Sequence, residues 1–102
     1  MIRHCVFLRF RADVPQAERD GIEADLRALR PLVDGFLNMS FGPNASPEGL
    51  GQGFAHGFTM DFRDAAARDA YLIHPAHQAV GKRVVAALEG GVDGLIVFDL
   101  EI

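Results

Sequence analysis

The sequence contains few of the residues that mark secreted, membrane or nucleic-acid-binding proteins. Its 102 residues include one cysteine, Cys5, and a single lysine, Lys82, beside nine arginines. A lone cysteine forms no internal disulfide, which favours a reducing, cytoplasmic setting. No apolar run approaches the roughly 18 residues that a membrane helix needs, and the first residues show no signal-peptide pattern. We therefore expect a cytoplasmic protein that does not contact a membrane.

The chain also has no cluster of positive charge. Ten lysines and arginines stand against fourteen aspartates and glutamates, which gives a net charge of −4. Nucleic acids and anionic membranes attract basic surfaces, so this balance argues against either partner. Hydrophobic residues make up 49% of the chain, and this composition and length predict one globular domain over residues 1–102.

Signatures of nucleophilic and phosphate chemistry are absent as well. The chain has neither a Gly-x-Ser-x-Gly motif nor a Gly-Lys-Ser/Thr motif. The glycine-rich residues 42–53 lead into a strand pattern rather than a helix, so we interpret them as a long hairpin loop. The carboxylates offer no catalytic pair, because Asp13, Asp34, Asp64 and Asp93 fall at caps or turns. Asp61 and Asp99 are expected on strand faces opposite His56, toward solvent.

Strand and helix patterns alternate along the chain. Period-two alternation predicts four strands, at residues 2–10, 37–41, 54–62 and 95–102. Helical spacing predicts a first helix that Asp13 caps and that ends near Arg30. A second helical region follows the candidate cap Asp64 and ends at Gly90. This region must be interrupted just before Pro75, since proline has no amide hydrogen and restricts the preceding residue.

The resulting order of elements predicts an α+β, ferredoxin-like βαββαβ fold, in which a four-stranded antiparallel sheet carries its helices on one face. A chain of this length buries only about 65% of its unfolded surface, so the other face needs a cover. In the first strand that face carries Cys5 and Phe7 between arginines. We predict that a second copy of the chain covers it, which gives a homodimeric α/β barrel.

Three of the four histidines, His4, His56 and His77, fall on otherwise apolar faces, where a polar group needs a partner. Tyr71, the only tyrosine, precedes His77 by six residues. On a continuous helix these two side chains would point about 120° apart, but the break at Pro75 can realign them. His77 then lies in the first turn of a helix, whose dipole keeps the imidazole neutral near pH 7.

This pattern gives a hypothesis of acid–base chemistry. His77 is the candidate base, and Tyr71 is the candidate donor of a hydrogen bond to a carbonyl. His4 and His56 are candidate substrate-binding residues that line a cavity between the sheet and the helices. The alternative is a non-enzymatic dimer in which these side chains satisfy one another inside the core. His74, which precedes a proline, is expected to cap the second helical segment.

Histidine also binds metals. His74 with His77 could be joined by His4 or His56 to give three nitrogen ligands. The chain offers no second closely spaced pair of metal-binding residues. The pattern therefore favours no metal site.

Three features carry a resemblance to a known family: His4 in an apolar first strand, the loop at residues 42–49, and the run from Tyr71 to His77, which reads Tyr-Leu-Ile-His-Pro-Ala-His. With these features the chain resembles, over nearly its whole length, the stress-responsive dimeric α/β-barrel (Dabb) family. The resemblance implies the same fold and the same dimer. Carried over from a plant polyketide cyclase of that family, it implies that His77 is the base, that Tyr71 is its partner, and that His4 and His56 are pocket residues.

The function expected from the residues and the resemblance together is a stress-responsive homodimer that holds a small, largely apolar carbonyl compound. Its chemistry would be cyclase-like and would need neither metal nor cofactor. Two other interpretations stay open. One is the structural dimer with a buried histidine and tyrosine network, and the other is a monooxygenase or haem-binding protein built on a similar dimeric barrel.

Overall fold

The structure, a computed structural model, describes every residue from Met1 to Ile102. The strands are β1 (Ile2–Leu8), β2 (Phe36–Pro43), β3 (His56–Phe62) and β4 (Leu95–Glu101). The helices are α1 (Gln16–Arg27), α2 (Ala65–Ile73) and α3 (Pro75–Ala87), with short 3₁₀ helices η1 (Arg30–Leu32) and η2 (Gly91–Gly94). None of the helices has the length and hydrophobicity to span a bilayer.

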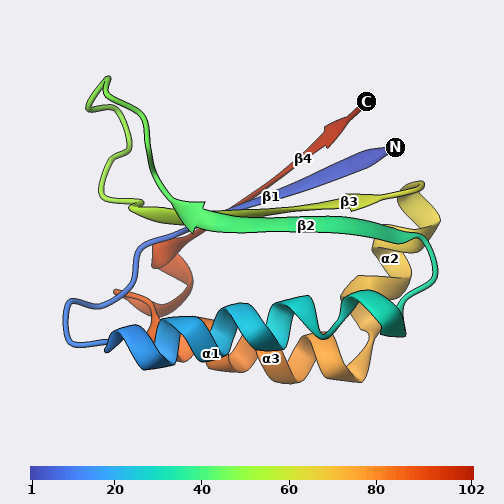
Figure 1. The fold of residues 1–102 in the computed structure, drawn as a ribbon, viewed down its shortest axis with the longest axis horizontal. Coiled ribbons are helices and arrows are strands. Elements are labelled where there is room, and N and C mark those ends of the chain that lie inside the picture. The colour runs from blue at the N-terminus through green and yellow to red at the C-terminus, as the bar shows by residue number, and fades with distance from the viewer.

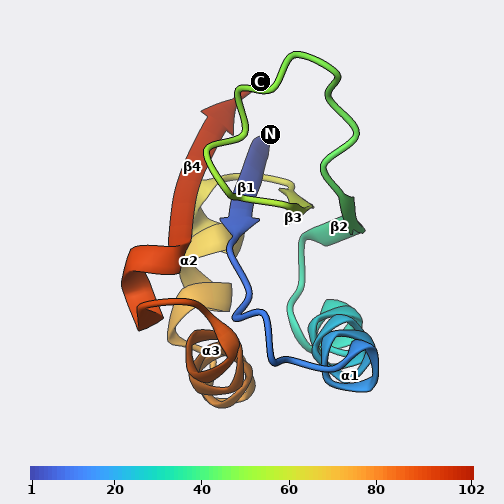
Figure 2. The same cartoon turned by 90° about the vertical axis from the view of Figure 1, so that its left-hand side faces the viewer.

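The four strands form one antiparallel sheet in the order β2-β3-β1-β4. Helices α1 and α3 lie side by side under one face of the sheet, and α2 lies on the same side (Figure 1 and Figure 2). We call this the inner face and the helix-free side the outer face. The arrangement confirms the predicted ferredoxin-like fold, with all of its helices on one face of the sheet.

The first helix departs from its predicted boundaries at both ends. It begins at Gln16 without a side-chain cap, because Pro15 occupies the N-cap position. Asp13, the predicted cap, lies two residues earlier and accepts a hydrogen bond from Arg11 (Nε to Oδ1, 2.9 Å). Its α-helical part ends at Arg27 rather than near Arg30, where a separate 3₁₀ turn begins. Both differences are local and leave the order of elements unchanged.

Strand β1 runs through the interior of the sheet and alternates as predicted. Its side chains at Ile2, His4, Val6 and Leu8 are buried on the inner face, whereas Phe7 is exposed on the outer face. The strand ends at Leu8, two residues earlier than predicted. This alternation carries a histidine into the hydrophobic core.

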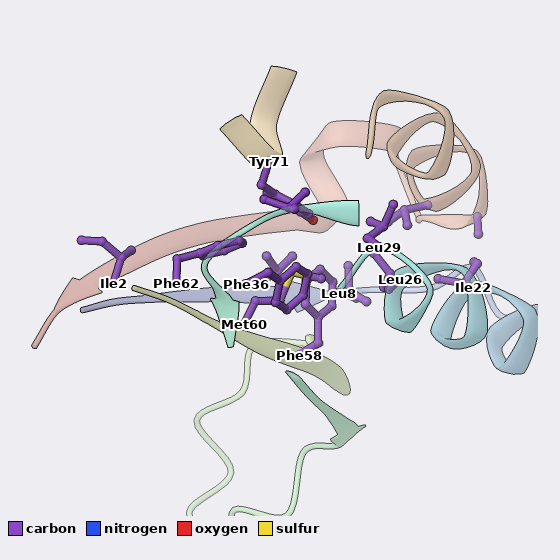
Figure 3. Packing of buried hydrophobic residues seen from close by; sticks show 14 of the residues in the cluster. Ile2, Leu8, Ile22, Leu26, Leu29, Phe36, Phe58, Met60, Phe62 and Tyr71 are labelled. Atoms are coloured by element: carbon purple, nitrogen blue, oxygen red, sulfur yellow. The ribbon is translucent and has the colours of Figure 1, made fainter. Parts of the chain in front are cut away.

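The core lies between the inner face and the helices, and Figure 3 shows its aromatic part. Tyr71 projects from α2 toward the sheet. Its ring centroid lies 5.8 Å from that of Phe36 on β2 and 5.0 Å from that of Phe62 on β3. Burial of these large rings removes much apolar surface from water and fixes α2 against the sheet.

The outer face is open and apolar. Phe7, Ile96, Phe98 and Leu100 expose between 42% and 58% of their surface on this side. The long connection between β2 and β3, residues 44–55, rises on the same side, away from α1 and α3 (Figure 1). Neighbouring apolar side chains left in water on a small domain commonly mark a protein interface.

Candidate functional site

The candidate site is built around the joint between α2 and α3. The side chain of Asp64 caps α2 by accepting a hydrogen bond from the Ala67 amide at 2.9 Å, as predicted. At the other end of α2, His74 adopts an extended conformation and caps α3, its Nδ1 accepting from the Ala76 amide at 3.0 Å. The expected capping role of His74 is therefore confirmed. Pro75 follows as the first residue of α3, which makes the joint a sharp bend rather than a continuous helix.

This bend brings Tyr71 and His77 together. Their ring centroids lie 4.3 Å apart, with an angle of 47° between the ring planes. The His77 ring is further fixed by its Nδ1, which lies 3.0 Å from the carbonyl oxygen of Leu72. A carbonyl oxygen only accepts, so Nδ1 carries the hydrogen and the neutral ring keeps the lone pair of Nε2 for a proton or a ligand.

Burial sets the protonation states of this pair. Tyr71 is only 1% exposed, and burial raises the pKa of its phenol above the ordinary value near 10. Burial also lowers the pKa of His77 below 6.5, an effect that outweighs the hydrogen bond to Leu72. At neutral pH the pair therefore consists of a protonated phenol, which can donate a hydrogen bond, and a neutral imidazole, which can accept a proton.

His4 lies next to this pair, inside the core. It is 4% exposed, and its ring centroid lies 5.8 Å from that of Tyr71. The rings of Phe58 and Phe62 also surround it, at 6.5 Å and 6.2 Å. The structure thus brings together three of the four predicted site residues, namely His4, Tyr71 and His77.

A carboxylate that the sequence analysis placed elsewhere completes the cluster. Asp99 was expected on the face opposite His56, toward solvent, but it pairs with His4 across β1 and β4 and lies on the inner face. Its Oδ1 lies 2.6 Å from Nδ1 of His4, and its Oδ2 accepts from Nη1 of Arg68 at 2.7 Å. The register of β4 against β1 decides the face, and the strand pattern alone does not give that register.

Asp61 was also expected to point toward solvent, and this expectation was only partly correct. It does lie on the face opposite His56, but it is 5% exposed rather than solvated. Arg3 on β1 covers it, with Nε 2.8 Å and Nη2 3.1 Å from the two carboxylate oxygens. These charge-assisted bonds outweigh burial and lower the pKa of Asp61. Asp61 therefore belongs to the outer face and not to the candidate site.

His56 is separated from the other three predicted site residues. It pairs with Leu8 at the far end of β1, whereas His4 pairs with Met60. Its ring contacts Phe10, with centroids 5.3 Å apart. Burial, and then the charge of Arg19, lowers its pKa. A substrate-binding role of His56 stays a prediction, and it would apply to a different end of the inner face.

The histidines considered as metal ligands are not brought together as a set of three. No group of three or more histidine, cysteine, aspartate or glutamate side chains is arranged to hold a metal ion. The Nδ1 atom of His74 already accepts a hydrogen bond from the backbone, and His77 bonds Leu72. The clustered histidines are thus engaged by hydrogen bonds within the chain.

The main cavity lies beneath the β2–β3 connection, mostly over the outer face, and its volume is about 710 Å³. Its walls include Phe7, Ser40, Leu50 and Ile96, and also His56, one of the two predicted substrate-binding residues. His4, Tyr71 and His77 do not line this cavity. Half-buried His77 is the member of the cluster that meets solvent.

Comparisons with known proteins agree with this architecture. The family described as Stress responsive A/B Barrel Domain (Dabb) matches residues 2–102. A dimeric ferredoxin-like protein from Jannaschia sp. CCS1 is 35% identical, with a TM-score of 0.92, and the match covers 99% of this chain and 98% of that one. The structure of the hydroxynitrile lyase from Passiflora edulis is 24% identical, with a TM-score of 0.87, and the match covers 99% and 92% of the two chains.

A curated relative is more distant in sequence. Olivetolic acid cyclase from Cannabis sativa is 20% identical over 80 residues, which cover 78% of this chain and 79% of that protein.

Proposed function

Because the chain belongs to the Stress responsive A/B Barrel Domain family, we propose that it is a homodimer whose His77 and Tyr71 carry out acid–base chemistry on a small carbonyl compound. The observation that carries this proposal is the contact of the two rings at 4.3 Å, with the His77 tautomer fixed by Leu72. A base and a hydrogen-bond donor side by side are what proton removal next to a carbonyl needs.

The outer face supports the dimer. It exposes four large apolar side chains, and the 35% identical Jannaschia relative is described as dimeric. In a two-fold dimer the same patch on each chain faces its copy, so exposed Phe7 and Phe98 would be covered on both sides. The site at His77 opens on the inner side of the sheet, where such a dimer leaves it free.

The proposed reaction step is a proton transfer from carbon. The Nε2 atom of His77 takes a proton from the carbon next to the carbonyl, and the electron pair of that C–H bond moves into an enolate. The O–H of Tyr71 donates a hydrogen bond to the enolate oxygen, where negative charge develops. The relative named olivetolic acid cyclase supports a cyclase-like reaction, in which such an enolate carbon would attack a second carbonyl carbon.

Deuterium exchange tests the proposal without knowledge of the natural substrate. Acetophenone is incubated with the protein in D₂O, and loss of its methyl proton signal is followed by NMR. We expect His77→Ala to abolish the protein-dependent exchange and Tyr71→Phe to lower it, since a general base contributes about 10²- to 10⁴-fold. Gln78→Ala, on the exposed side of α3, is the control and should exchange like the unchanged protein. Full exchange by His77→Ala would end the assignment.

One observation favours a second candidate function, a structural dimer without catalysis. His4 and Tyr71 are 4% and 1% exposed, so the inner part of the cluster is closed in this structure. In that case the His77→Ala variant should lose about 1–3 kcal/mol of stability, since it removes a partner from a buried cluster, and no exchange should occur in any variant. A loss of stability in His77→Ala, measured by urea unfolding, together with no exchange in the unchanged protein would support the structural dimer.

A further inference from the structure

A chain of polar contacts joins α2, β4 and β1 beside the candidate site. Arg68 on α2 donates from Nη1 to Oδ2 of Asp99 on β4 at 2.7 Å. The other carboxylate oxygen of Asp99 lies 2.6 Å from Nδ1 of His4 on β1. Arg68 and Asp99 each expose 23% of their side chains, whereas the side chain of His4 is 5% exposed. The contacts thus lead from the half-buried edge of the sheet into the core.

The chemistry of these contacts fixes the tautomer of His4. An ionised carboxylate only accepts hydrogen bonds, so the hydrogen lies on Nδ1 of His4 and the neutral ring has its lone pair on Nε2. The remaining neighbours of the ring are aromatic, namely Phe58, Phe62 and Tyr71. Asp99 is therefore the polar group that orients His4.

The same arrangement occurs at His77, with a different acceptor. There the carbonyl of Leu72 takes the hydrogen bond from Nδ1, at 3.0 Å. Both imidazoles near Tyr71 thus have Nδ1 tied to an oxygen, which leaves the Nε2 atom of each neutral ring as a hydrogen-bond acceptor.

We infer that Arg68 and Asp99 are positioning residues that hold His4 as its Nδ1–H tautomer, so that Nε2 of His4 acts as a second acceptor beside Tyr71. This inference rests on the proposed acid–base function of the cluster. It gives His4 a defined hydrogen-bonding role in place of the general role of lining a cavity, and it adds two residues to the site.

Two features support a role of Arg68 beyond general stability. It lies three residues before Tyr71 on α2, so both side chains leave the same side of the helix and one rigid element places both. It also stabilises the carboxylate form of Asp99. Burial of Asp99 disfavours its charge, but the hydrogen bonds from Arg68 and His4 outweigh burial and lower the pKa of Asp99. A protonated Asp99 could donate to His4 and reverse the tautomer.

Nitrogen NMR of ¹⁵N-histidine-labelled protein tests the inference directly, at a pH where the rings are neutral. We expect the His4 signal to report hydrogen on Nδ1. In Asp99→Ala the ring loses its acceptor, so the signal should shift to that of the Nε2–H form. Arg68→Ala should give a mixture of the two forms, while Arg68→Lys and Asp99→Asn, which keep a donor and an acceptor, should retain the Nδ1–H form.

The other histidines serve as internal references in the same spectra. His74 accepts at Nδ1 from the Ala76 amide and therefore reports the opposite tautomer, while His77 reports the Nδ1–H form. Unchanged signals of both show that a variant is folded. An Nε2–H tautomer of His4 in the unchanged protein, or no change in Asp99→Ala, would overturn the inference. If the His4 signal changed in Asp99→Ala but not in Arg68→Ala, Asp99 would remain a positioning residue and Arg68 would not be one.

The acetophenone experiment gives an independent result. Absence of exchange would end the proposed catalysis and leave the tautomer measurement intact. If His4 has its hydrogen on Nε2, Arg68 and Asp99 are not positioning residues, and the exchange test of His77 is unaffected.

Discussion

His77 is held by a backbone carbonyl of the preceding helix: its Nδ1 lies 3.0 Å from the oxygen of Leu72. In a continuous helix the Leu72 carbonyl would accept from the Ala76 amide. Here that amide donates to the His74 side chain, and Pro75 interrupts the helix. The same break that turns His77 toward Tyr71 therefore supplies the acceptor that orients its ring.

The joint itself can be tested by Pro75→Ala. Alanine restores an amide and lifts the restriction on His74, so α2 and α3 can join and the His77 ring turns away from Tyr71. We expect loss of the nuclear Overhauser contact between the two rings and at least about a tenfold fall in any exchange activity. Stability should also fall, because the cluster loses the packing of the His77 ring on Tyr71. Pro47→Ala, in the exposed β2–β3 connection, is the control and should leave both readouts unchanged.

The lowered pKa values of His77 and His56 predict how stability depends on pH. Burial is the main cause of both lowered pKa values, and in the unfolded chain both histidines have the ordinary pKa near 6.5. Below that pH the unfolded state binds more protons than the folded state, so these histidines make the protein less stable as the pH falls. Urea unfolding should therefore give a lower free energy of unfolding at pH 5.5 than at pH 7.5.

The double variant with His56→Gln and His77→Gln should have a flatter profile between these two pH values. The carboxylates with lowered pKa, such as Asp61 and Asp99, lose their contribution only at lower pH, below about 4. A stability that stays constant or rises from pH 7.5 to 5.5 would contradict the prediction.

Much of the fold follows from patterns that the sequence shows directly. The alternation in β1 and β3, the cap at Asp64 and the break at Pro75 each depend on neighbouring residues, and the structure contains all of them. The predicted cap at Asp13 was wrong, because the helix begins later, with Pro15 at the N-cap position, and the Asp13 carboxylate accepts from Arg11. Local patterns give elements, but they do not show which of two local contacts forms.

Less of the candidate site could be predicted from the sequence, because the site depends on the register between strands that are far apart in the chain. Tyr71, His74 and His77 are close in sequence and were grouped correctly. Asp99 was placed on the wrong face, although a carboxylate inside an apolar strand is a sign of a buried partner. The register of β4 against β1 places it opposite His4, and the local sequence pattern does not give that register.

The dimer can be tested with one charge on the outer face. Phe98 is 58% exposed there, and two-fold symmetry brings each substitution into the interface twice. Phe98→Glu should therefore weaken the dimer by about a hundredfold or more, measured by light scattering over a dilution series. Leu32→Glu, on the helix side and 53% exposed, should leave the dimer intact. Equal behaviour of the two variants would place the interface elsewhere.

Gly21 on α1 makes room for Arg83 on α3. A Cβ atom at residue 21 would lie 2.5 Å from Nη2 of Arg83, which donates hydrogen bonds to Glu18 and Asp25 on α1. Glycine inside a helix costs about 1 kcal/mol relative to alanine, so Gly21→Ala should stabilise the protein if nothing opposed it. We expect a clearly smaller gain, or a loss, because the guanidinium must leave its place.

Chemical denaturation in two backgrounds separates these effects. In Arg83→Ala protein the obstacle is gone, so Gly21→Ala should recover a gain of about 1 kcal/mol. Gly81 on α3 is the matched control, since a Cβ there meets nothing within 4 Å, and Gly81→Ala should give the same gain in both backgrounds. An equal gain from Gly21→Ala in the unchanged protein and in the Arg83→Ala protein would contradict the prediction. It would show that the position of the Arg83 guanidinium does not require a glycine at residue 21.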